Sequence, residues 1–411
     1  MGSTIRTSIL VPKWVWRLIN IGFFETAFLT LAMYAISLIP PQRPRPHSWL
    51  LGDWFINYQG GFVRRGLAGE IFLGVSSLLG IRIEILVVIV LMLLYLAFVT
   101  NACRLSMGSS FSPINAMLVF SPAFMLFPIL DSQAGFRKEL LLFTLISTLC
   151  MILARSRAKI PRYLPVFTGL VCAALILSHE MLIVFLPYLL CPLIIHERGF
   201  GVATRRAILF MMPAAILVVA VATLGQGSQQ TVSAICESLK TSAPVDCLSP
   251  GILPGAITFL AKNLASAHAF VLESNPPPTL LVYGASAILS FTPLVLKIRT
   301  GEFRESLDGT HVGFWLAVCI GSALVASLPL LWIVADYGRL IHIHVVCLTL
   351  LTLMATQEHN NEPLRFRLGL PNIAIWLLCL LFIGSWRLIH RGASAQSSFV
   401  LYSMIRSALG L

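Results

Sequence analysis

Long hydrophobic runs constrain the fold of this chain more than any other feature of its sequence. About eleven apolar stretches follow one another, and most approach the roughly 20 residues that a helix needs to cross a bilayer. They lie at about 18–39, 85–103, 113–130, 140–154, 163–178, 181–196, 207–224, 278–296, 312–333, 340–356 and 372–388. Inside a bilayer the backbone must satisfy its own hydrogen bonds, so such segments form helices. The sequence therefore predicts an all-α fold, a polytopic transmembrane helix bundle of about 11 spans.

The composition excludes an ordinary soluble protein. Of the 411 residues, 57% are hydrophobic and only 11% are charged, and the mean hydropathy is +0.86. The net charge of +12 does not indicate a nucleic-acid partner, because no nucleic-acid module is visible and many basic residues lie in short loops between apolar runs. The first apolar run is too long for a signal peptide, so we expect a retained first span surrounded by membrane lipids.

The distribution of basic residues predicts the topology. Basic residues recur in alternate loops, which favours a cytoplasmic N-terminus in a bacterial cytoplasmic (inner) membrane, although the total bias is weak. The chain 1–411 then forms a single integral membrane domain, with a first outer loop at 40–84 and a large outer loop at 225–277. The short apolar stretch 66–80 is expected to be an interfacial or re-entrant helix, because a span there would move the basic cluster at 155–162 outside.

Two cysteines differ from the rest. Most of the nine lie in apolar runs, where a thiol behaves as a small hydrophobe. Cys236 and Cys247 instead share the 225–277 loop and can pair if it faces an oxidising compartment, although the sequence does not decide whether they do.

Four ionisable segments fall on the outer face in this topology. They are DWFINYQGGFVRRGLAGE at 53–70, DSQAGFRKE at 131–139, HE at 179–180 and DYGR at 336–339. Ionisable groups at membrane depth are costly and tend to face a cavity or a partner, so each segment is a candidate for a functional site.

The arginines on this face suggest an anionic ligand. Arg64 and Arg65 follow a pair of glycines that allow close backbone approach, beside the start of a predicted helix. The alternative is that these arginines only reach lipid headgroups, and that Arg137, Lys138 and Glu139 anchor a span. The predicted substrate-binding residues are Asn57, Tyr58, Arg64, Arg65, Glu70, Arg137, Lys138, Asp336 and Arg339.

Four residues are predicted to be catalytic: Asp53, Asp131, His179 and Glu180. A carboxylate in a partly dry cleft gains basicity and can take a proton from an attacking hydroxyl, which suits Asp53 or Asp131 as the base. Either can instead cap a helix. The pair His179 and Glu180 interrupts an apolar stretch and implies a broken helix or a sharp re-entrant corner. It can supply a base, pair structurally, or help to hold a divalent cation, and no cofactor is certain.

These motifs together resemble those of bacterial multi-pass surface-polysaccharide assembly proteins. NYQGGFVRRGLAGE, GFRKE, the isolated HE and the late DYGR are similar to the layout of Wzy-like polymerases and membrane-embedded C-type glycosyltransferases. The resemblance covers the layout of most of the chain, through short motifs. It implies a glycosyltransferase of O-antigen or capsule synthesis that uses a polyprenyl-linked glycan at the outer face, beside other polysaccharide-assembly proteins.

The resemblance also implies roles for individual residues. Arginines would compensate the departing phosphate, Asp53 would be the base, and aromatic side chains would stack on sugar rings or line the lipid cleft. Those side chains are Trp54, Phe55, Tyr58 and Phe62. Asp53 has no adjacent acid, unlike many C-type enzymes, which favours a polymerase over an enzyme that adds a single sugar. A transporter or flippase of lipid-linked glycan, or a structural subunit, is the alternative without catalysis.

Overall fold

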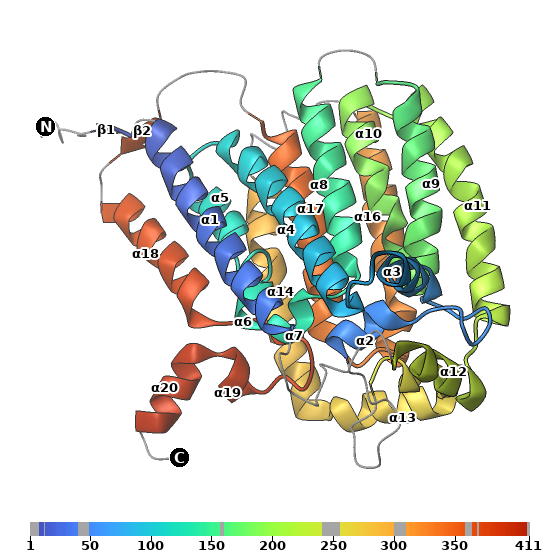
Figure 1. Ribbon diagram of the computed structural model, residues 1–411. Coiled ribbons are helices and arrows are strands. Elements are labelled where there is room, and N and C mark those ends of the chain that lie inside the picture. The colour runs from blue at the N-terminus through green and yellow to red at the C-terminus, as the bar shows by residue number, and fades with distance from the viewer. Residues whose placement is uncertain are drawn as a thin grey trace, which may run out of the picture.

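Helices that run side by side make up most of the chain (Figure 1). The structure is a computed structural model that describes residues 8–11, 13–39, 49–156, 160–240, 255–299, 310–357, 364–367 and 370–408. In its first half it contains β1 Ser8–Val11, α1 Lys13–Ser37, α2 Leu50–Phe55, α3 Gly66–Leu79, α4 Ile83–Met107, α5 Pro113–Val119, α6 Phe127–Leu130, α7 Ser132–Gly135, α8 Glu139–Arg155, α9 Tyr163–Ser178, the 3₁₀-helix η1 Glu180–Leu189 and α10 Cys191–Glu197. In its second half it contains α11 Val202–Leu224, α12 Gln229–Leu239, η2 Thr258–Ala261, α13 Leu264–Ser274, α14 Pro277–Arg299, α16 Thr310–Ser327, η3 Leu328–Trp332, α17 Tyr337–Ala355, β2 Leu364–Arg367, α18 Leu370–Ser385, α19 Ala395–Ser398 and α20 Val400–Ala408.

The predicted helical membrane bundle is confirmed in outline. Within the described residues, 7 helical segments are long and apolar enough to cross a membrane. They are Lys13–Ser37, Ile83–Met107, Glu180–Glu197, Val202–Leu224, Pro277–Arg299, His311–Trp332 and Tyr337–Ala355. The chain is therefore a multi-pass membrane protein, while the count of eleven spans stays a prediction.

The other predicted spans fall on shorter elements. Helix α8 has 17 residues, and α9 and α18 have 16 each. The predicted span at 113–130 is divided into α5 and α6, because Pro122 in the connecting turn cannot continue a helix. Short or broken helices of this kind can still lie at membrane depth when neighbouring helices satisfy their free backbone groups.

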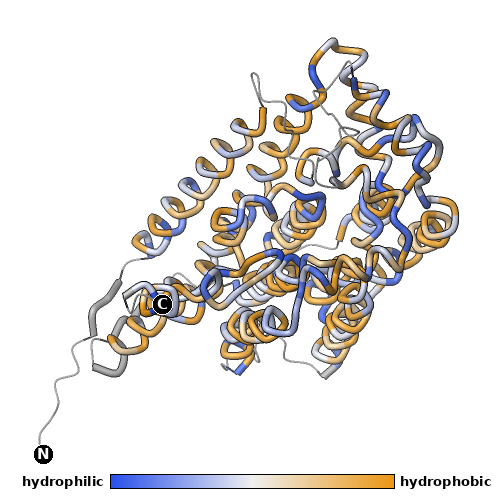
Figure 2. The backbone as a smooth tube through the Cα atoms, turned by 90° about the horizontal axis from the view of Figure 1, so that it is seen from below, coloured by the Kyte–Doolittle hydropathy of each residue, from blue (hydrophilic) through white to orange (hydrophobic). Residues whose placement is uncertain are grey.

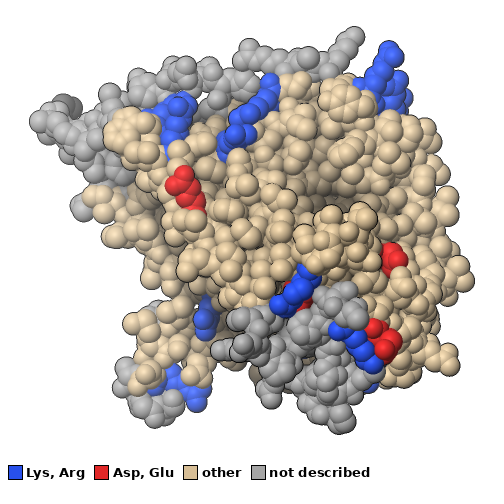
Figure 3. All heavy atoms as spheres, viewed as in Figure 1, with Lys and Arg blue, Asp and Glu red and all other residues tan. Residues whose placement is uncertain are grey.

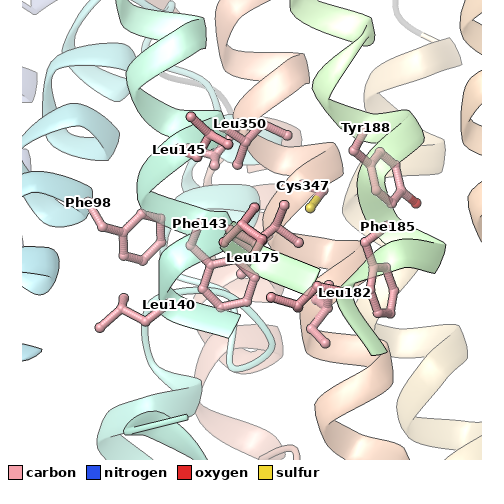
Figure 4. Close-up of a cluster of buried hydrophobic side chains, with 14 of the residues drawn as sticks. Phe98, Leu140, Phe143, Leu145, Leu175, Leu182, Phe185, Tyr188, Cys347 and Leu350 are labelled. Carbon is pink, nitrogen blue, oxygen red and sulfur yellow. The ribbon is translucent and has the colours of Figure 1, made fainter. Parts of the chain in front are cut away.

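Helix α17 forms the centre of the bundle. Of its most apolar stretch 83% is buried, against 22% for α11 and for α16, which therefore lie at the periphery. Large side chains from α4, α8, α9, η1 and α17 interlock around it, among them Phe98, Phe143, Leu175, Phe185 and Leu350 (Figure 4). Close packing of this kind fixes the helices relative to one another, and with them the groups at the helix ends.

The outer surface carries few charges in its middle. On the face drawn in Figure 3, most of the charged side chains lie near the top or the bottom, with a broad belt of other residues between them. Long apolar side chains such as Leu281, Ile288 and Leu209 are more than half exposed in this bundle. A water-soluble protein rarely exposes so much apolar surface, whereas a bilayer accommodates it.

The connecting elements gather at one end of the bundle, which is the lower end in Figure 1. Helices α8 and α17 begin there and α9 ends there, and α2, α12 and α13 lie across it. Figure 2 looks onto this end and shows hydrophilic stretches between the hydrophobic helices. Figure 1 shows α3 nearly end-on beside helices seen in profile, and its location at the membrane interface stays a prediction.

Two further local predictions can be compared with the structure. The corner expected at 179–180 is present, because α9 ends at Ser178, His179 is extended, and η1 starts at Glu180. The all-α expectation misses one small element, since β1 and β2 form a two-stranded antiparallel sheet that pairs Ser8 with Arg367. The part of the first loop at 40–48 lies outside the described residues.

Glycine at position 69 allows α3 to pack closely against the end of α2, and this generates a first prediction. A methyl group there would lie 2.1 Å from the carbonyl oxygen of Ile56, whereas one on Gly74 of the same helix meets nothing within 4 Å. We expect Gly69→Ala to lower the free energy of unfolding by about 1–3 kcal/mol. The matched variant Gly74→Ala should not destabilise the protein. Thermal unfolding of both variants in detergent checks this, and equal midpoints would contradict the packing.

Candidate functional site

Charged residues from four separate segments meet at the lower end of the bundle. They come from the first loop, the start of α8, the corner after α9 and the start of α17, as the sequence predicted. We call the following ten residues the charged cluster: Asp53, Arg64, Arg65, Arg137, Lys138, Glu139, His179, Glu180, Asp336 and Arg339.

An ion pair between Arg65 and Glu180 joins the first loop to the corner after α9. Arg65 Nε lies 3.0 Å from Oε1 and 2.9 Å from Oε2 of Glu180, and Nη2 lies 2.8 Å from Oε1. Paired hydrogen bonds of this kind are the stronger form of arginine–carboxylate contact. The backbone of Arg65 is in the left-handed region, with φ 69°, directly before α3 begins at Gly66. Burial alone would lower the pKa of Arg65, but Glu180 and Asp53 raise it above its ordinary value, so the guanidinium stays charged.

Asp53 is a buried carboxylate in α2 that remains ionised. Its side chain is 3% exposed, and Oδ1 lies 3.5 Å from Arg65 Nη1. Burial alone would raise the pKa of Asp53, but the positive charges of Lys138 and Arg65 hold it well below its ordinary value. The expectation that a dry cleft makes this carboxylate more basic is therefore wrong, because neighbouring cations outweigh desolvation. Asp53 is therefore negatively charged at pH 7 and can accept hydrogen bonds.

Lys138 contacts the first loop and interacts electrostatically with Asp53. Its side chain is fully buried, and Nζ donates to the carbonyl oxygen of Arg65 over 3.0 Å. The ammonium also lies 5.9 Å from the centre of the Trp54 ring. Burial lowers the pKa of Lys138 to about 8, although Asp53 opposes this shift. Lys138 is thus close to exchanging its proton near neutral pH, which the sequence did not indicate.

A second group of ion pairs joins the first turns of α8 and α17. Arg339 donates to Glu139 Oε1, and Arg339 Nη1 lies 2.5 Å from Asp336 Oδ2. His179 Nε2 lies 4.0 Å from the same oxygen of Glu139, and burial lowers the pKa of His179 to about 4, so its ring is neutral at pH 7. Glu139 was not among the predicted site residues. Its position beside Arg137 and Lys138 in GFRKE was the available signal.

Arg64 and Arg137 are the two arginines of the charged cluster that no described carboxylate pairs with. Arg137 is 6% exposed and donates to the carbonyl oxygen of Trp49, while its Nε has no described partner. The Nε of Arg64 also has no described hydrogen-bond partner. Burial and the charge of Arg65 together lower the pKa of Arg64.

The charged cluster has an excess of positive charge. Five basic side chains face four carboxylates, and His179 is neutral at pH 7. Buried charge without a counterpart is unfavourable, so a bound anion would relieve the imbalance at Arg64 or Arg137.

Three predicted substrate-binding residues shape the first loop. Glu70 accepts the backbone N–H of Tyr58 over 2.8 Å and the side-chain amide of Gln59 over 3.0 Å. Asn57 donates to Ser238 of α12 over 3.0 Å. These contacts hold the loop that carries Arg64 and Arg65, and direct binding of substrate by Asn57, Tyr58 or Glu70 stays a prediction.

Helix α12 covers the first loop. A methyl group on Gly60 would lie 2.7 Å from the backbone of Thr231, and the backbone N–H of Arg64 donates to Gly225 over 2.9 Å. Cys236 of α12 is disulfide-bonded, whereas seven other cysteines are free. Cys247, the partner considered from the sequence, lies outside the described residues.

Asp131 lies apart from the ion pairs of the charged cluster. Its Oδ2 accepts both the backbone N–H of His390, over 2.9 Å, and the ring Nδ1–H of His390, over 2.8 Å. Burial would raise the pKa of Asp131, but these hydrogen bonds lower it. His390 in turn accepts the backbone N–H of Gly338 over 3.2 Å, so Asp131 fastens the segment after α18 beside the start of α17. No pattern in the sequence indicates this pairing.

The aromatic residues of the first loop lie differently from what the resemblance implied. Trp54 and Phe55 are 1% and 0% exposed and belong to the core, so they cannot stack on a sugar in this structure. Tyr58 stacks on Phe62, with ring centres 5.7 Å apart, and Phe62 is 44% exposed. Stacking of a sugar on Tyr58 or Phe62 stays a prediction.

The carboxylates of the charged cluster do not form a ready metal site. In the described parts of the chain, no three His, Cys, Asp or Glu side chains lie together in a way that could hold a metal ion. Asp53, Glu139 and Glu180 instead contact basic side chains. A small cavity beside them is lined by Arg137, Glu139, Arg339 and His342, among others.

The fold and the site define a multi-pass helical membrane protein with a buried charged cluster at one end of its bundle. Residues 23–268 match the family described as uncharacterised membrane protein Rv1490, and the chain belongs to this family. The matched region contains the part of the charged cluster from Asp53 to Glu180, whereas Asp336, Arg339 and His390 lie beyond it. No curated protein and no solved structure matches the chain.

The burial of Lys138 predicts a pH-dependent stability. Its pKa is about 8 in the folded protein against 10.5 ordinarily, so the unfolded chain binds more protons between these values. The contribution of Lys138 to stability should therefore rise as the pH rises from about 8 to about 10.5. We expect Lys138→Met to lack this rise when unfolding is measured between pH 7 and pH 9.5.

The exposed lysine Lys262 supplies the matched control. Lys262→Met should keep the pH dependence of the wild type, which also contains the effects of all other titrating groups. If the stabilities of Lys138→Met and of the wild type changed in parallel with pH, Lys138 would not be buried as described.

Proposed function

We propose that the protein is a membrane glycosyltransferase that transfers sugar from a polyprenyl-(pyro)phosphate-linked donor to a glycan acceptor. The observation that carries the proposal is the excess positive charge of the buried cluster, in which Arg64 and Arg137 form no ion pair with a described carboxylate. A phosphate carried by a membrane lipid suits such a site, because it brings negative charge to the end of an apolar bundle.

The charged cluster can stabilise a departing phosphate. Negative charge builds on the phosphate as the glycosidic bond breaks, and preorganised cations reduce the energy of that state. The N-terminal ends of α8 and α17 lie at the same place, at Glu139 and Tyr337, and add their partial positive charges. In this arrangement Arg64 and Arg137 contact the phosphate, while Arg65 and Arg339 are held by carboxylates and position the site.

Asp53 is the proposed acceptor of the proton from the attacking hydroxyl. It is ionised, and its buried Oδ2 has no hydrogen-bond partner among the described residues, so this oxygen can still accept a hydrogen bond. Its lowered pKa makes it a weak base. Proton transfer then follows the attack instead of preceding it, as the hydroxyl becomes acidic when the new bond forms.

The other three predicted catalytic residues are not the base in this scheme. They are Asp131, His179 and Glu180. Glu180 is engaged by Arg65 through two oxygens, and Asp131 is engaged by His390, so both position other groups. His179 is neutral and its Nδ1 has no described partner. It remains a candidate to relay the proton that Asp53 accepts.

The location of the charged cluster favours an enzyme over a transporter. Transporters tend to place their charged groups near the bilayer midplane, whereas here they lie where helices begin or end. We place the lower end at the outer face of a bacterial cytoplasmic membrane, with the N-terminus in the cytoplasm. The disulfide-bonded Cys236 in α12 supports this orientation, because disulfides persist in oxidising compartments.

Removal of the Asp53 charge tests catalysis directly. We expect Asp53→Asn to lower the rate of sugar transfer by the purified protein by at least roughly 100-fold. Glu84→Gln is the matched control, because Glu84 is also buried and paired with an arginine, Arg82, but lies outside the charged cluster. Glu84→Gln should retain the wild-type rate of sugar transfer. If wild type forms no glycosidic bond but moves lipid-linked glycan across liposomes, the protein is a transporter instead.

The proposed division between the two adjacent arginines generates a further prediction. Arg65→Gln should lower the free energy of unfolding by roughly 1–3 kcal/mol, because Glu180 loses its partner. Arg64→Gln should not lower the free energy of unfolding, and it should raise the KM for the donor by roughly tenfold, because a charge-assisted contact to phosphate is lost. Thermal unfolding and donor titration separate the two effects. Equal destabilisation by both variants would contradict the assignment.

A further inference from the structure

Three aromatic rings from distant segments lie together at the lower end of the bundle, outside the charged cluster. They belong to Trp49 before α2, Phe259 in η2 and Phe270 in α13, and all three are half-buried. The ring centres of Trp49 and Phe259, and of Phe259 and Phe270, are 5.6 Å apart, and those of Trp49 and Phe270 are 6.4 Å apart. We call these residues the aromatic group. Unlike Trp54 and Phe55, they remain partly accessible.

Two hydrogen-bond donors border the aromatic group. The guanidinium of the exposed residue Arg391 lies 5.4 Å from the centre of the Phe270 ring. Neither its N–H groups nor the indole N–H of Trp49 has a partner among the described residues. Aromatic side chains with a few donors beside them are the usual lining of a small-molecule site. A pyranose ring offers the complement, because it has an apolar C–H face and a rim of hydroxyl groups.

The aromatic group is connected to the charged cluster through Arg137. Its guanidinium donates to the carbonyl oxygen of Trp49, and it also lines the cavity that contains Glu139 and Arg339. A second connection runs through the segment after α18. There His390 is bound to Asp131, and the next residue, Arg391, lies over Phe270. The two groups are therefore neighbours, held by the same side chains.

An arginine also lies beside a pair of stacked aromatic rings elsewhere in the chain, away from the charged cluster. Phe200 stacks on Trp315 with ring centres 4.4 Å apart, and Arg205 lies 5.9 Å from the Phe200 ring. That pair lies near the starts of α11 and α16, at the opposite end from the charged cluster (Figure 1). An aromatic ring beside an arginine is thus not enough to indicate a site. Continuity with the charged cluster distinguishes the aromatic group from this pair.

We infer that the aromatic group and Arg391 form the subsite for a pyranose ring of the acceptor. This inference rests on the proposed function, because only a transferase has an acceptor. A transferase needs a place for each of its two substrates. The charged cluster has the chemistry for an anionic phosphate, and the aromatic group has the chemistry for an uncharged ring. In this arrangement the acceptor hydroxyl reaches the charged cluster past Arg137, from the side where Trp49 lies.

Saturation-transfer NMR on the purified protein in nanodiscs tests the subsite without requiring transfer activity. The probes are the methyl pyranosides of glucose, galactose, mannose and N-acetylglucosamine, with the acyclic polyol sorbitol as the negative control. We expect saturation of the ring C–H protons of at least one pyranoside and none of sorbitol. Phe270→Leu keeps an apolar side chain but removes the ring, and should weaken binding about three- to tenfold.

Two further variants make the test specific. Phe200→Leu removes a ring of the opposite pair and should bind as wild type does. Arg391→Gln changes an exposed side chain and should weaken binding even if Phe270→Leu unfolds. The subsite is overturned if no pyranoside is saturated, if sorbitol is saturated equally, or if neither Phe270→Leu nor Arg391→Gln weakens binding. Pyranoside binding by a wild type that transfers no sugar would keep the subsite and refute the proposed transferase.

Discussion

The ion pair between Arg65 and Glu180 is the interaction on which the lower end of the bundle depends. Each charge would be costly to bury alone, and the paired geometry makes their burial possible. Because Arg65 belongs to the first loop and Glu180 begins η1, the pair fixes the distance between two segments far apart in sequence. Lys138 then binds the backbone of Arg65, which brings the start of α8 to the same point. The remaining charged residues assemble around this contact.

The irregular parts of the chain are the geometric consequence of that contact. A regular helix through His179 would continue past the lower end of the bundle, whereas the extended residue forms a corner there, and η1 starts at Glu180. Arg65 likewise adopts a left-handed backbone at the entrance to α3, and close packing of Gly69 on Ile56 holds that helix across the bundle. Backbone strain of this kind persists only where surrounding contacts determine it, and such places are often functional. Here the surrounding contacts are the ion pairs.

Much of the architecture could be predicted because it depends on local pattern. Apolar runs indicated the helices, and their alternation brought 53–70, 131–139, 179–180 and 336–339 to one end. The alternation of apolar runs and loops cannot show which side chain each ionisable group contacts. Asp131 is 259 residues from His390, and no periodicity connects the two. The ionisation of Asp53 was misjudged for the same reason, because its pKa depends on Lys138 and Arg65, which approach only in the folded chain.

The arrangement of the lower end also explains why the proposed donor and acceptor sites would act together. Arg137 uses one nitrogen on the carbonyl oxygen of Trp49 and lines the cavity beside Arg339 and Glu139. A ligand that moves Trp49 therefore moves the cation that the proposal assigns to phosphate. The same reasoning applies through His390 and Arg391, which are consecutive and contact Asp131 and Phe270. If both proposed sites bind their ligands, these two connections are the contacts through which a displacement at one site would reach the other.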